Sequence, residues 1–430
     1  MGKRKPRKPG KESTKTATTK IDLISNLPNF LLFHILSFLP TRCAMATSVL
    51  ARRWRHLWKD LLVLDLDNSE ESPYYLPGGR HRFVDFVDSV FAQRTAPHVE
   101  KLRLTCEIPM DKRKSSKTWF RTAVGPHLKE LYLDLTLHNH QGYGRVKLPE
   151  KNLELDLDCV DPNSVICSCR ALENLKLTLR EAFPTKSWET PELHMPPTLK
   201  RLTLIQADET EEFLNDIEEL VINTPLLEYL SITLWARCLE VSISDYPNMV
   251  EAHLDIDQDK EQVGWVVELF KALHQTKLLD LKLSTMECLL VASRFELPEF
   301  SRLVNLELEI PYFDSGFMIE LLHNCNMLQV LTLHNREKVS TLELEEPNCW
   351  KLPTKDPDCV ISHLKIFEFK GYQDSADEHG FVAYLLERGP ILETMKIHAD
   401  PSLGPKYKKC IHKQLSRVPR SSKTCQLKVT

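Results

Sequence analysis

Apolar side chains recur at two different spacings along the chain, and the spacing changes near residue 98. Between residues 22 and 61, Leu27, Leu31, Ile35 and Leu39 stand at every fourth position, which is the spacing of a helix rather than of a strand. From residue 98 onward a short unit of the form LxxLxL recurs instead. The pattern therefore predicts a helical segment near the start of the chain and an array of strands after it.

The helical segment is predicted to form three short helices. The first carries the stripe above, Thr41 can cap a second helix over residues 43–48, and a third over residues 52–58 places Trp54 and Trp58 one turn apart. A unit this small cannot bury so many large side chains by itself. Two interpretations stay open on the pattern alone: the helices dock onto a partner, or they cap the neighbouring part of the chain.

The LxxLxL unit returns along the rest of the chain at intervals that lie mostly between 22 and 29 residues. This period is typical of leucine-rich repeats, in which each unit adds one strand to a parallel sheet on the inside of a horseshoe. One strand with its return segment cannot bury its leucines, whereas a stack shares a continuous core. The last apolar positions of the units are Leu104, Leu133, Leu155, Leu177, Leu204, Ile232, Leu254, Leu283, Leu308, Leu333, Phe369 and Ile397.

Return segments join these strands, and residues 211–224 and 264–276 have helical spacing. Within each strand the residue between two leucines points to the opposite, solvated face, because side chains alternate along a strand. This concave face is the candidate target-binding surface. Its residues share no single charge or chemistry: Arg103, Tyr132, Lys176, Thr203, Ser231, Lys282, Glu307 and Thr332.

Composition fits a folded protein with a basic N-terminal tail. The 430 residues are 42% hydrophobic and 27% charged with a net charge of −4, yet residues 1–20 hold eight Lys or Arg and a single acid. This tail is predicted to be disordered and solvated, with nuclear import or nucleic-acid binding as alternatives. The acidic remainder makes nucleic acid an unexpected partner.

Neither a membrane nor a disulfide framework is expected. The most apolar stretch, residues 30–39, is too short to cross a bilayer, and no apolar segment of a secretory signal follows the basic tail. The twelve cysteines contain no CxxC pair, so reduced thiols in an intracellular compartment fit better.

Motifs that carry catalysis or hold a metal are missing from the sequence. No GxSxG, HExxH, GxGxxG or GxxxxGK[ST] motif occurs. Asp255 begins a segment like a calcium loop, but Lys260 replaces the glycine that its turn needs. His138 and His140 lack a third ligand in register, and Cys167 and Cys169 lack a second pair. We expect no enzyme activity of the chain itself, no metal and no cofactor.

The segment DLISNLPNFLLFHILSFLPTRCAMATSVLARRWRHLW, residues 22–58, resembles the F-box of the plant F-box, FBD and leucine-rich-repeat family. The resemblance implies that the segment binds a Skp-type adaptor and, through it, a cullin–RING ligase core. It favours the docking interpretation over the capping one. The residues that it implies form or support the adaptor surface are Leu27, Pro28, Leu31, Ile35, Leu36, Leu39, Val49 and Trp54.

The C-terminal part resembles the FBD region of the same family. Residues 350–397 contain a tryptophan, a Pro-x-Cys, an LKxFEFKGY strand and an AYLLERGPILE segment, and residues 414–429 resemble the closing strand of that region. We expect this region to end the stack by covering its last strand, because an open strand edge needs protection.

Together these features predict an α/β protein: a three-helix F-box, an irregular leucine-rich-repeat horseshoe and an FBD-type C-terminal cap. The expected divisions are a tail (1–20), the F-box (21–66), a linker or N-terminal cap (67–97), the repeats (98–346) and the FBD region (347–430). The resemblance implies a substrate receptor of a Skp–cullin–F-box ubiquitin ligase in the nucleus, the cytoplasm or both. The alternative is a scaffold that keeps the F-box fold but delivers no target for degradation.

Overall fold

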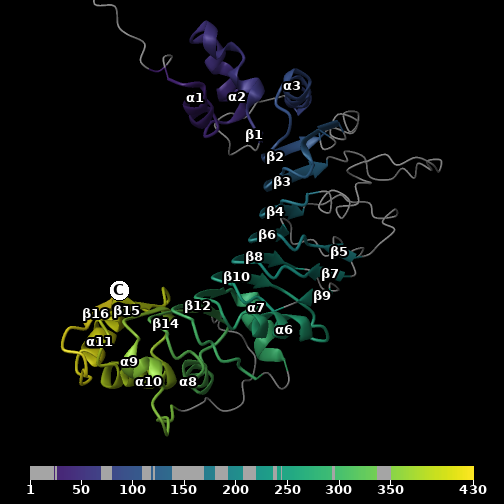
Figure 1. Cartoon of the computed structure of the whole chain (residues 1–430). Coiled ribbons are helices and arrows are strands. Elements are labelled where there is room, and N and C mark those ends of the chain that lie inside the picture. The colour runs from purple at the N-terminus through teal and green to yellow at the C-terminus, as the bar shows by residue number, and fades with distance from the viewer. Residues whose placement is uncertain are drawn as a thin grey trace, which may run out of the picture.

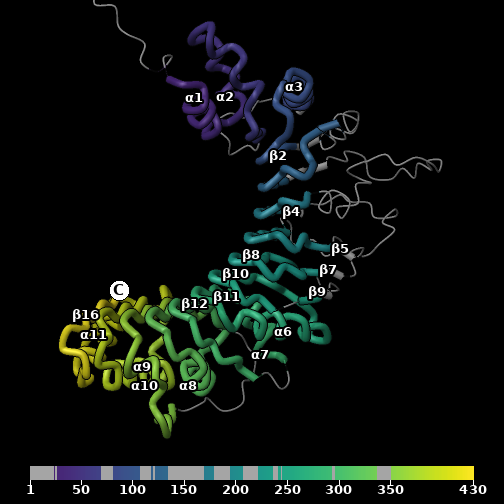
Figure 2. The backbone as a smooth tube through the Cα atoms, viewed as in Figure 1, coloured from purple at the N-terminus to yellow at the C-terminus, as the bar shows by residue number. Residues whose placement is uncertain are grey.

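A computed structural model of the chain contains one large parallel sheet with helices on one side. The structure describes residues 24, 27–68, 80–108, 118–119, 122–137, 169–179, 192–206, 219–235, 240–243, 245–292, 296–336 and 350–430. Within these ranges the main sheet has 13 strands, and its order in space follows its order in the chain. Figure 1 shows the strands as a curved stack that begins at an N-terminal helical unit, and Figure 2 shows the C-terminal helices at the other end.

The strands of the main sheet are short and parallel to their neighbours. The first six are β1 (Val63–Asp67), β2 (Lys101–Ile108), β3 (Glu130–Leu137), β4 (Asn174–Leu179), β6 (Arg201–Gln206) and β8 (Tyr229–Leu234). The others are β10 (Glu251–Ile256), β11 (Leu278–Leu281), β12 (Asn305–Ile310), β13 (Val330–Asn335), β14 (Ile366–Tyr372), β15 (Thr394–Ala399) and β16 (Gln426–Val429).

Ten of the twelve predicted apolar positions form one row across this sheet, in which Leu133 and Leu177 are half-buried and the other eight are buried. Leu104 pairs in register with Leu133, Leu133 with Leu177, and the pairing continues strand by strand to Ile397. Side chains alternate between buried and half-buried along the strands, as the period of two requires. Leu155 lies outside the described residues.

One repeat is in a different register from the one predicted. Leu281, not Leu283, pairs with Leu308, so Asp280 is the neighbour of Glu307 on the polar face. Leu283 begins the helix α7 (Leu283–Val291), and Lys282 is its N-cap residue in an extended conformation. The sequence LLDLKL allows either Leu281 or Leu283 to occupy the buried position of the strand. Because α7 begins at Leu283, Leu281 takes that position.

The returns after β10 are mostly helical. The prediction for residues 264–276 is confirmed in α6 (Gly264–Ala272), whose apolar side buries Val266, Leu269 and Phe270. Further returns are α8 (Ser315–His323), α9 (Asp358–Ser362), α10 (Ala376–Arg388) and α11 (Pro405–Leu415). These helices lie on the leucine side of the sheet and leave the other side open (Figure 1).

Three earlier returns contain strands instead. A second, three-stranded parallel sheet joins β5 (Glu192–His194), β7 (Glu219–Ile222) and β9 (Glu240–Ile243). The predicted helix over 211–224 is therefore wrong at residues 219–222, and residues 211–218 lie outside the described ranges. Strand pairing between successive returns overrides the local helical spacing here, and it fully buries Ile222.

The N-terminal unit consists of α1 (Asn29–Leu36), α2 (Thr41–Ala46) and three 3₁₀ helices, η1 (Thr47–Val49), η2 (Arg52–Arg55) and η3 (Leu57–Asp60). The predicted third α-helix is wrong, because the chain breaks at His56 between η2 and η3. Thr41 does not cap α2. Its hydroxyl is buried and accepts a hydrogen bond of 2.9 Å from the backbone N–H of Asp65 in β1. The unit is thus joined directly to the first strand of the sheet.

The segment between β1 and β2, predicted as a linker or cap, contains the helix α3 (Arg80–Gln93). Phe83, Val84, Val87 and Val90 are buried, and the helix packs against β2. It continues the core of the repeats toward the N-terminal unit.

The FBD-like region supplies the last strands of the same sheet. Gly371 has φ +74°, and a Cβ at this position would lie 2.3 Å from the backbone oxygen of Asn335 in the preceding strand. A Cβ on Gly380 of α10 would lie 2.2 Å from Cγ of Trp350. Trp350, Gly371 and Gly380 therefore serve close packing of the stack.

Candidate interaction surfaces

One side of α1 is buried and anchors the N-terminal unit. Leu32 and Leu36, one turn apart, are fully buried, and α1 packs against η3. Trp54 and Trp58 are buried in the same core. The helix therefore needs only one of its two apolar sides to hold the unit together.

The other side of α1 leaves large apolar side chains in water. Phe30 is 68% exposed and Phe38 75%, and the helix presents Leu31 and Ile35 between them. Val49 at the end of η1 is 87% exposed. We call this set the N-terminal apolar surface: Ile24, Phe30, Leu31, Ile35, Phe38, Val49 and Leu50. So many exposed large apolar side chains within one small unit are typical of a partner-binding site.

The structure separates the sequence-predicted adaptor residues into two groups. Pro28, Leu31, Ile35 and Val49 are exposed, whereas Leu36 and Trp54 are buried. Leu27 and Leu39 are half-buried and pack against the core. The first group can touch a partner, and the others hold those side chains in place.

Four residues of this surface, Ile24, Phe30, Phe38 and Leu50, lie outside the spacing that predicted the helical stripe. Phe30 and Phe38 are two turns apart and could have been found as a second stripe beside the predicted one. Choosing between the two stripes required knowing which side of α1 meets the tryptophans.

The polar face of the main sheet carries one side chain per strand in a continuous row, which we call the central row. Its register follows the strand pairing from β1 to β16. The row contains seven of the eight predicted concave residues, and Lys282 lies just beyond β11, where Asp280 takes its place. The members are Asp65, Arg103, Tyr132, Lys176, Thr203, Ser231, His253, Asp280, Glu307, Thr332, Glu368, Lys396 and Lys428.

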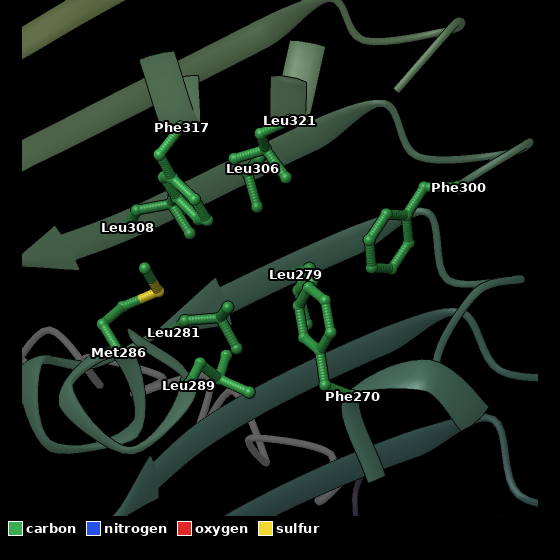
Figure 3. A pocket seen from close by; sticks show the side chains of 10 residues that line it. All are labelled: Phe270, Leu279, Leu281, Met286, Leu289, Phe300, Leu306, Leu308, Phe317 and Leu321. Atoms are coloured by element: carbon green, nitrogen blue, oxygen red, sulfur yellow. The ribbon is translucent and has the colours of Figure 1, made fainter. Parts of the chain in front are cut away.

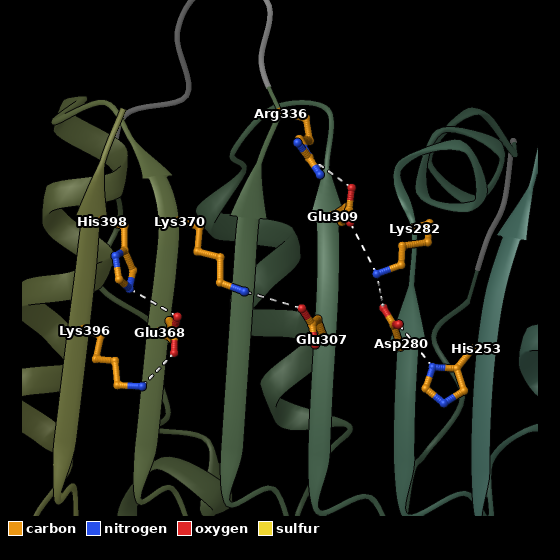
Figure 4. A network of polar contacts seen from close by, with 10 residues as sticks. All are labelled: His253, Asp280, Lys282, Glu307, Glu309, Arg336, Glu368, Lys370, Lys396 and His398. Atoms are coloured by element: carbon orange, nitrogen blue, oxygen red, sulfur yellow. Dashed lines mark hydrogen bonds and ion pairs between the residues drawn. The ribbon is translucent and has the colours of Figure 1, made fainter. Parts of the chain in front are cut away.

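From β10 to β15 the charges on this face pair with one another (Figure 4). His253 bonds Asp280 at 3.1 Å, and Lys282 bridges Asp280 at 3.2 Å and Glu309 at 3.3 Å. The chain of contacts ends at Arg336, 3.0 Å from Glu309. Separate pairs join Lys370 to Glu307, and Lys396 and His398 to Glu368.

These contacts change the pKa values of the side chains that make them. The hydrogen bond to Asp280 raises the pKa of His253 above its ordinary value, against the opposite effect of burial. Burial alone would raise the pKa of Asp280, but the hydrogen bond from His253 and the ammonium of Lys282 outweigh it and hold the pKa below the ordinary value. The cations and carboxylates of this half therefore already satisfy one another.

From β2 to β8 the same face is built from cations and tyrosine rings. The guanidinium of Arg103 lies 5.0 Å from the ring centre of Tyr132, and the ammonium of Lys176 lies 4.7 Å from it on the next strand. The guanidinium of Arg201 lies 3.9 Å from the ring centre of Tyr229. Cations held over rings at these distances are attracted by the π-electrons.

A small cavity on the leucine side is not a ligand site. Ten apolar side chains line it, including Phe270, Met286, Phe300 and Phe317. They come from β11, β12 and the helices that cover them, except Phe300, which lies in the segment before β12 (Figure 3). It has room for about one water molecule and offers no polar group to bind one. The cavity is a packing defect in the core.

The described residues hold no cluster of three or more metal-ligating side chains, and no described helix is long and apolar enough to cross a membrane. Burial raises the pKa of Cys288 to about 11 and that of Cys359 to about 12. Both thiols are therefore protonated at neutral pH and are poor nucleophiles. His138, His140 and Cys167 lie outside the described residues.

Comparison with known proteins assigns both ends of the chain. The F-box domain family matches residues 24–65, and the FBD family matches residues 352–397. An F-box/FBD/LRR-repeat protein of Arabidopsis thaliana is 27% identical over 95% of this chain and 99% of its own length. A second such protein is 28% identical over 94% of this chain and 92% of its own length, and an F-box/LRR-repeat protein of the same plant is 26% identical over 95% and 88%.

The F-box match covers the N-terminal apolar surface together with most of β1, and the FBD match covers β14, α10 and most of β15. The chain thus carries an F-box domain at its N-terminal end and an FBD region near its C-terminal end, and it is similar along most of its length to plant F-box/FBD/LRR-repeat proteins.

Proposed function

We propose that the protein is the substrate-recognition subunit of a Skp–cullin–F-box ubiquitin ligase. The observation that carries the proposal is the N-terminal apolar surface, because it lies within the segment that matches the F-box domain. A Skp-type adaptor would cover Pro28 and the exposed side chains of α1, η1 and Leu50. Leu27, Leu36, Leu39 and Trp54 support that surface from below.

We infer that the curved stack is a leucine-rich-repeat solenoid and that its open polar face binds the target protein. The period of the units, the parallel strand order and the shared leucine row support this inference. The divisions expected from the sequence serve as its working domains: 21–66, 67–97, 98–346 and 347–430.

The two proposed surfaces are connected rigidly. Strand β1 follows the N-terminal unit directly and pairs with β2 over its whole length, and Asp65 within it bonds Thr41 of α2. A rigid receptor holds a target lysine near the conjugating enzyme and raises its effective concentration, so the receptor itself needs no reactive group.

Adaptor binding is tested by reversing the character of one exposed side chain. Ile35→Lys should abolish co-purification with a Skp-type adaptor, because burying an isoleucine is worth about 1.5–3 kcal/mol and a buried unpaired charge adds a penalty. Val291→Lys is the matched control, since Val291 is 45% exposed and Ile35 41%. Undiminished recovery of the adaptor with Ile35→Lys refutes the proposal.

Target delivery needs a second measurement. Proteins captured on the repeats should accumulate and lose ubiquitin chains when this receptor is removed from cells. If adaptor binding is intact and neither changes, the protein acts as a scaffold that keeps the F-box fold. The proposed ligase role places the protein inside the cell, in the nucleus, the cytoplasm or both.

A further inference from the structure

The polar face of the sheet divides into two halves that differ in whether their charged side chains are already paired with one another. In the half from β10 to β15 the cations and carboxylates are paired with one another (Figure 4). An incoming charged group would have to break these pairs and leave a partner unsatisfied, which is unfavourable. The half from β3 to β8 has no such network among the described residues.

Two cations in that half have no carboxylate partner among the described residues. The ammonium of Lys176 contacts the ring of Tyr132, and the guanidinium of Arg201 contacts the ring of Tyr229; both rings are uncharged. Arg103 differs, because its guanidinium lies 3.0 Å from Asp67. Rings hold a cation in place without neutralising it, so Lys176 and Arg201 keep their charge available for an anion.

These cations lie close together on neighbouring strands. Lys176 of β4 pairs in register with Thr203 of β6, and Arg201 stands two residues before Thr203 on the same strand. Neighbouring strands are about 4.8 Å apart. Lys176 leans toward Tyr132 on β3 and Arg201 toward Tyr229 on β8, so the two cations can bind two anionic groups of one segment that crosses β4 and β6.

The surroundings add hydrogen-bond donors and flat apolar area. Thr203 and Ser231 are half-buried neighbours in the central row, and their hydroxyls face the same side as Lys176. The rings of Tyr132 and Tyr229 border the cations on opposite sides. Large aromatic side chains beside an arginine are a common composition of protein-binding hot spots. We call these six residues the cation–tyrosine patch.

The patch is bounded by acidic side chains, which limits what can bind there. Glu130 of β3, which pairs with Lys101 at 2.6 Å, lies two residues before Tyr132 at one end, and Glu251 of β10 lies at the other. A nucleic acid needs a longer continuous basic footprint for its phosphates. A short segment of protein needs only one or two anchoring charges.

Building on the proposed function, we propose that the cation–tyrosine patch recognises an extended, negatively charged segment of the target protein, with one carboxylate or phosphate group at Lys176 and another at Arg201. The arginine fork suits two oxygens of either group, and the threonine and serine hydroxyls donate to the remaining oxygens. The chain of the segment lies across the two tyrosine rings.

The test uses the full chain in complex with a Skp-type adaptor and an array of random-sequence peptides. The array contains each peptide with its serines free and with its serines phosphorylated, so that carboxylate and phosphate recognition are distinguished. Peptides bound by the wild type should be enriched in acidic residues, in phosphoserine or in both, and binding should weaken with salt. Lys176→Glu/Arg201→Glu should reduce binding of the selected peptides at least about tenfold, which corresponds to about 1.4 kcal/mol.

The matched control is Lys396→Glu/Lys428→Glu, which makes the same change in net charge on the same face of the sheet. It should leave peptide selection unchanged. Absence of acidic or phosphoserine enrichment, equal loss in the control, or stronger binding of a single-stranded RNA than of the selected peptides overturns the inference. The Ile35→Lys variant should lose the adaptor but select the same peptides. A failure of the ligase proposal can therefore be distinguished from a failure of the peptide-binding proposal.

Discussion

Replacing Gly380, which contacts Trp350, should have two opposing effects on stability: a gain in helix propensity and a steric clash with the indole. Replacing Gly by Ala within a helix normally stabilises it by about 1 kcal/mol. Here the new Cβ of Gly380→Ala would lie 2.2 Å from Cγ and 2.6 Å from Cβ of Trp350, near the root of the side chain rather than at its mobile end. The indole must therefore shift as a whole.

The size of the effect follows from what holds the indole. Its ring centre lies 5.5 Å from that of Tyr384 and 6.3 Å from that of Phe381, so displacement disturbs an aromatic cluster. Overpacking a well-packed site typically costs about 1–3 kcal/mol. A contact with the root of a ring puts the strain in the upper part of this range, about 2–3 kcal/mol. Since the helix propensity offsets about 1 kcal/mol of it, we expect a net loss of about 1–2 kcal/mol.

Amide hydrogen exchange of α10 is the suitable assay, because it reports the opening of this helix by itself. Protection of the α10 amides should fall roughly tenfold in Gly380→Ala, since about 1.4 kcal/mol is a factor of ten. In a Trp350→Ala background the same substitution should raise protection instead. A stabilising effect of Gly380→Ala with Trp350 present, or equal effects in both backgrounds, would refute the reasoning.

Three further predictions follow from buried or strained groups. Gly371→Ala should destabilise the C-terminal strands by at least about 2 kcal/mol, because its backbone is left-handed and the new Cβ meets the Asn335 carbonyl, and thermal unfolding measures the loss. Asp377→Ala should cost about 2–4 kcal/mol in urea unfolding, since it removes the acceptor of two hydrogen bonds from Ser315. His253 should titrate above 6.5 by NMR, and the stability that it adds should be present below pH 6.5 and lost as pH rises through the higher folded value.

Each of these has an outcome that contradicts it. A Gly371→Ala protein with an unchanged melting temperature would show that the backbone can relax there. Full stability of Asp377→Ala would mean that water replaces the carboxylate. A His253→Gln protein whose stability falls between pH 6.5 and 8 as steeply as that of the wild type would assign the pH dependence to other groups.

The sheet was predictable from sequence because each leucine row must be buried by its neighbours. The same reasoning failed at β11, where LLDLKL offers leucines at both 281 and 283. Only the pairing of Leu281 with Leu308 and the start of α7 fix the frame. This register error assigned Lys282 to the position on the polar face that Asp280 occupies.

The predicted adaptor residues all lie within the segment that matches the F-box domain, and the structure shows which of their side chains are exposed. Spacing identified Leu31 and Ile35 but could not tell the exposed side of α1 from the side that meets Trp54. The charge pairing of the polar face was also beyond prediction, because it joins residues such as His253 and Asp280 on different strands. Pairing in space determines which cations stay available for a partner.

The strand that follows the N-terminal unit, β1, belongs to the same sheet as all later strands of the stack. The number of strands from β1 therefore gives the distance of any strand from the N-terminal unit. The central row advances by about 4.8 Å per strand, so β4 stands three strand spacings and β8 five from β1, roughly 14–24 Å along the stack. Gain or loss of one repeat between β1 and the patch would move a bound target by one such step and turn it slightly with the twist of the sheet. Under the proposed ligase function, such a step would change which target lysines are presented for modification without any change in either binding surface.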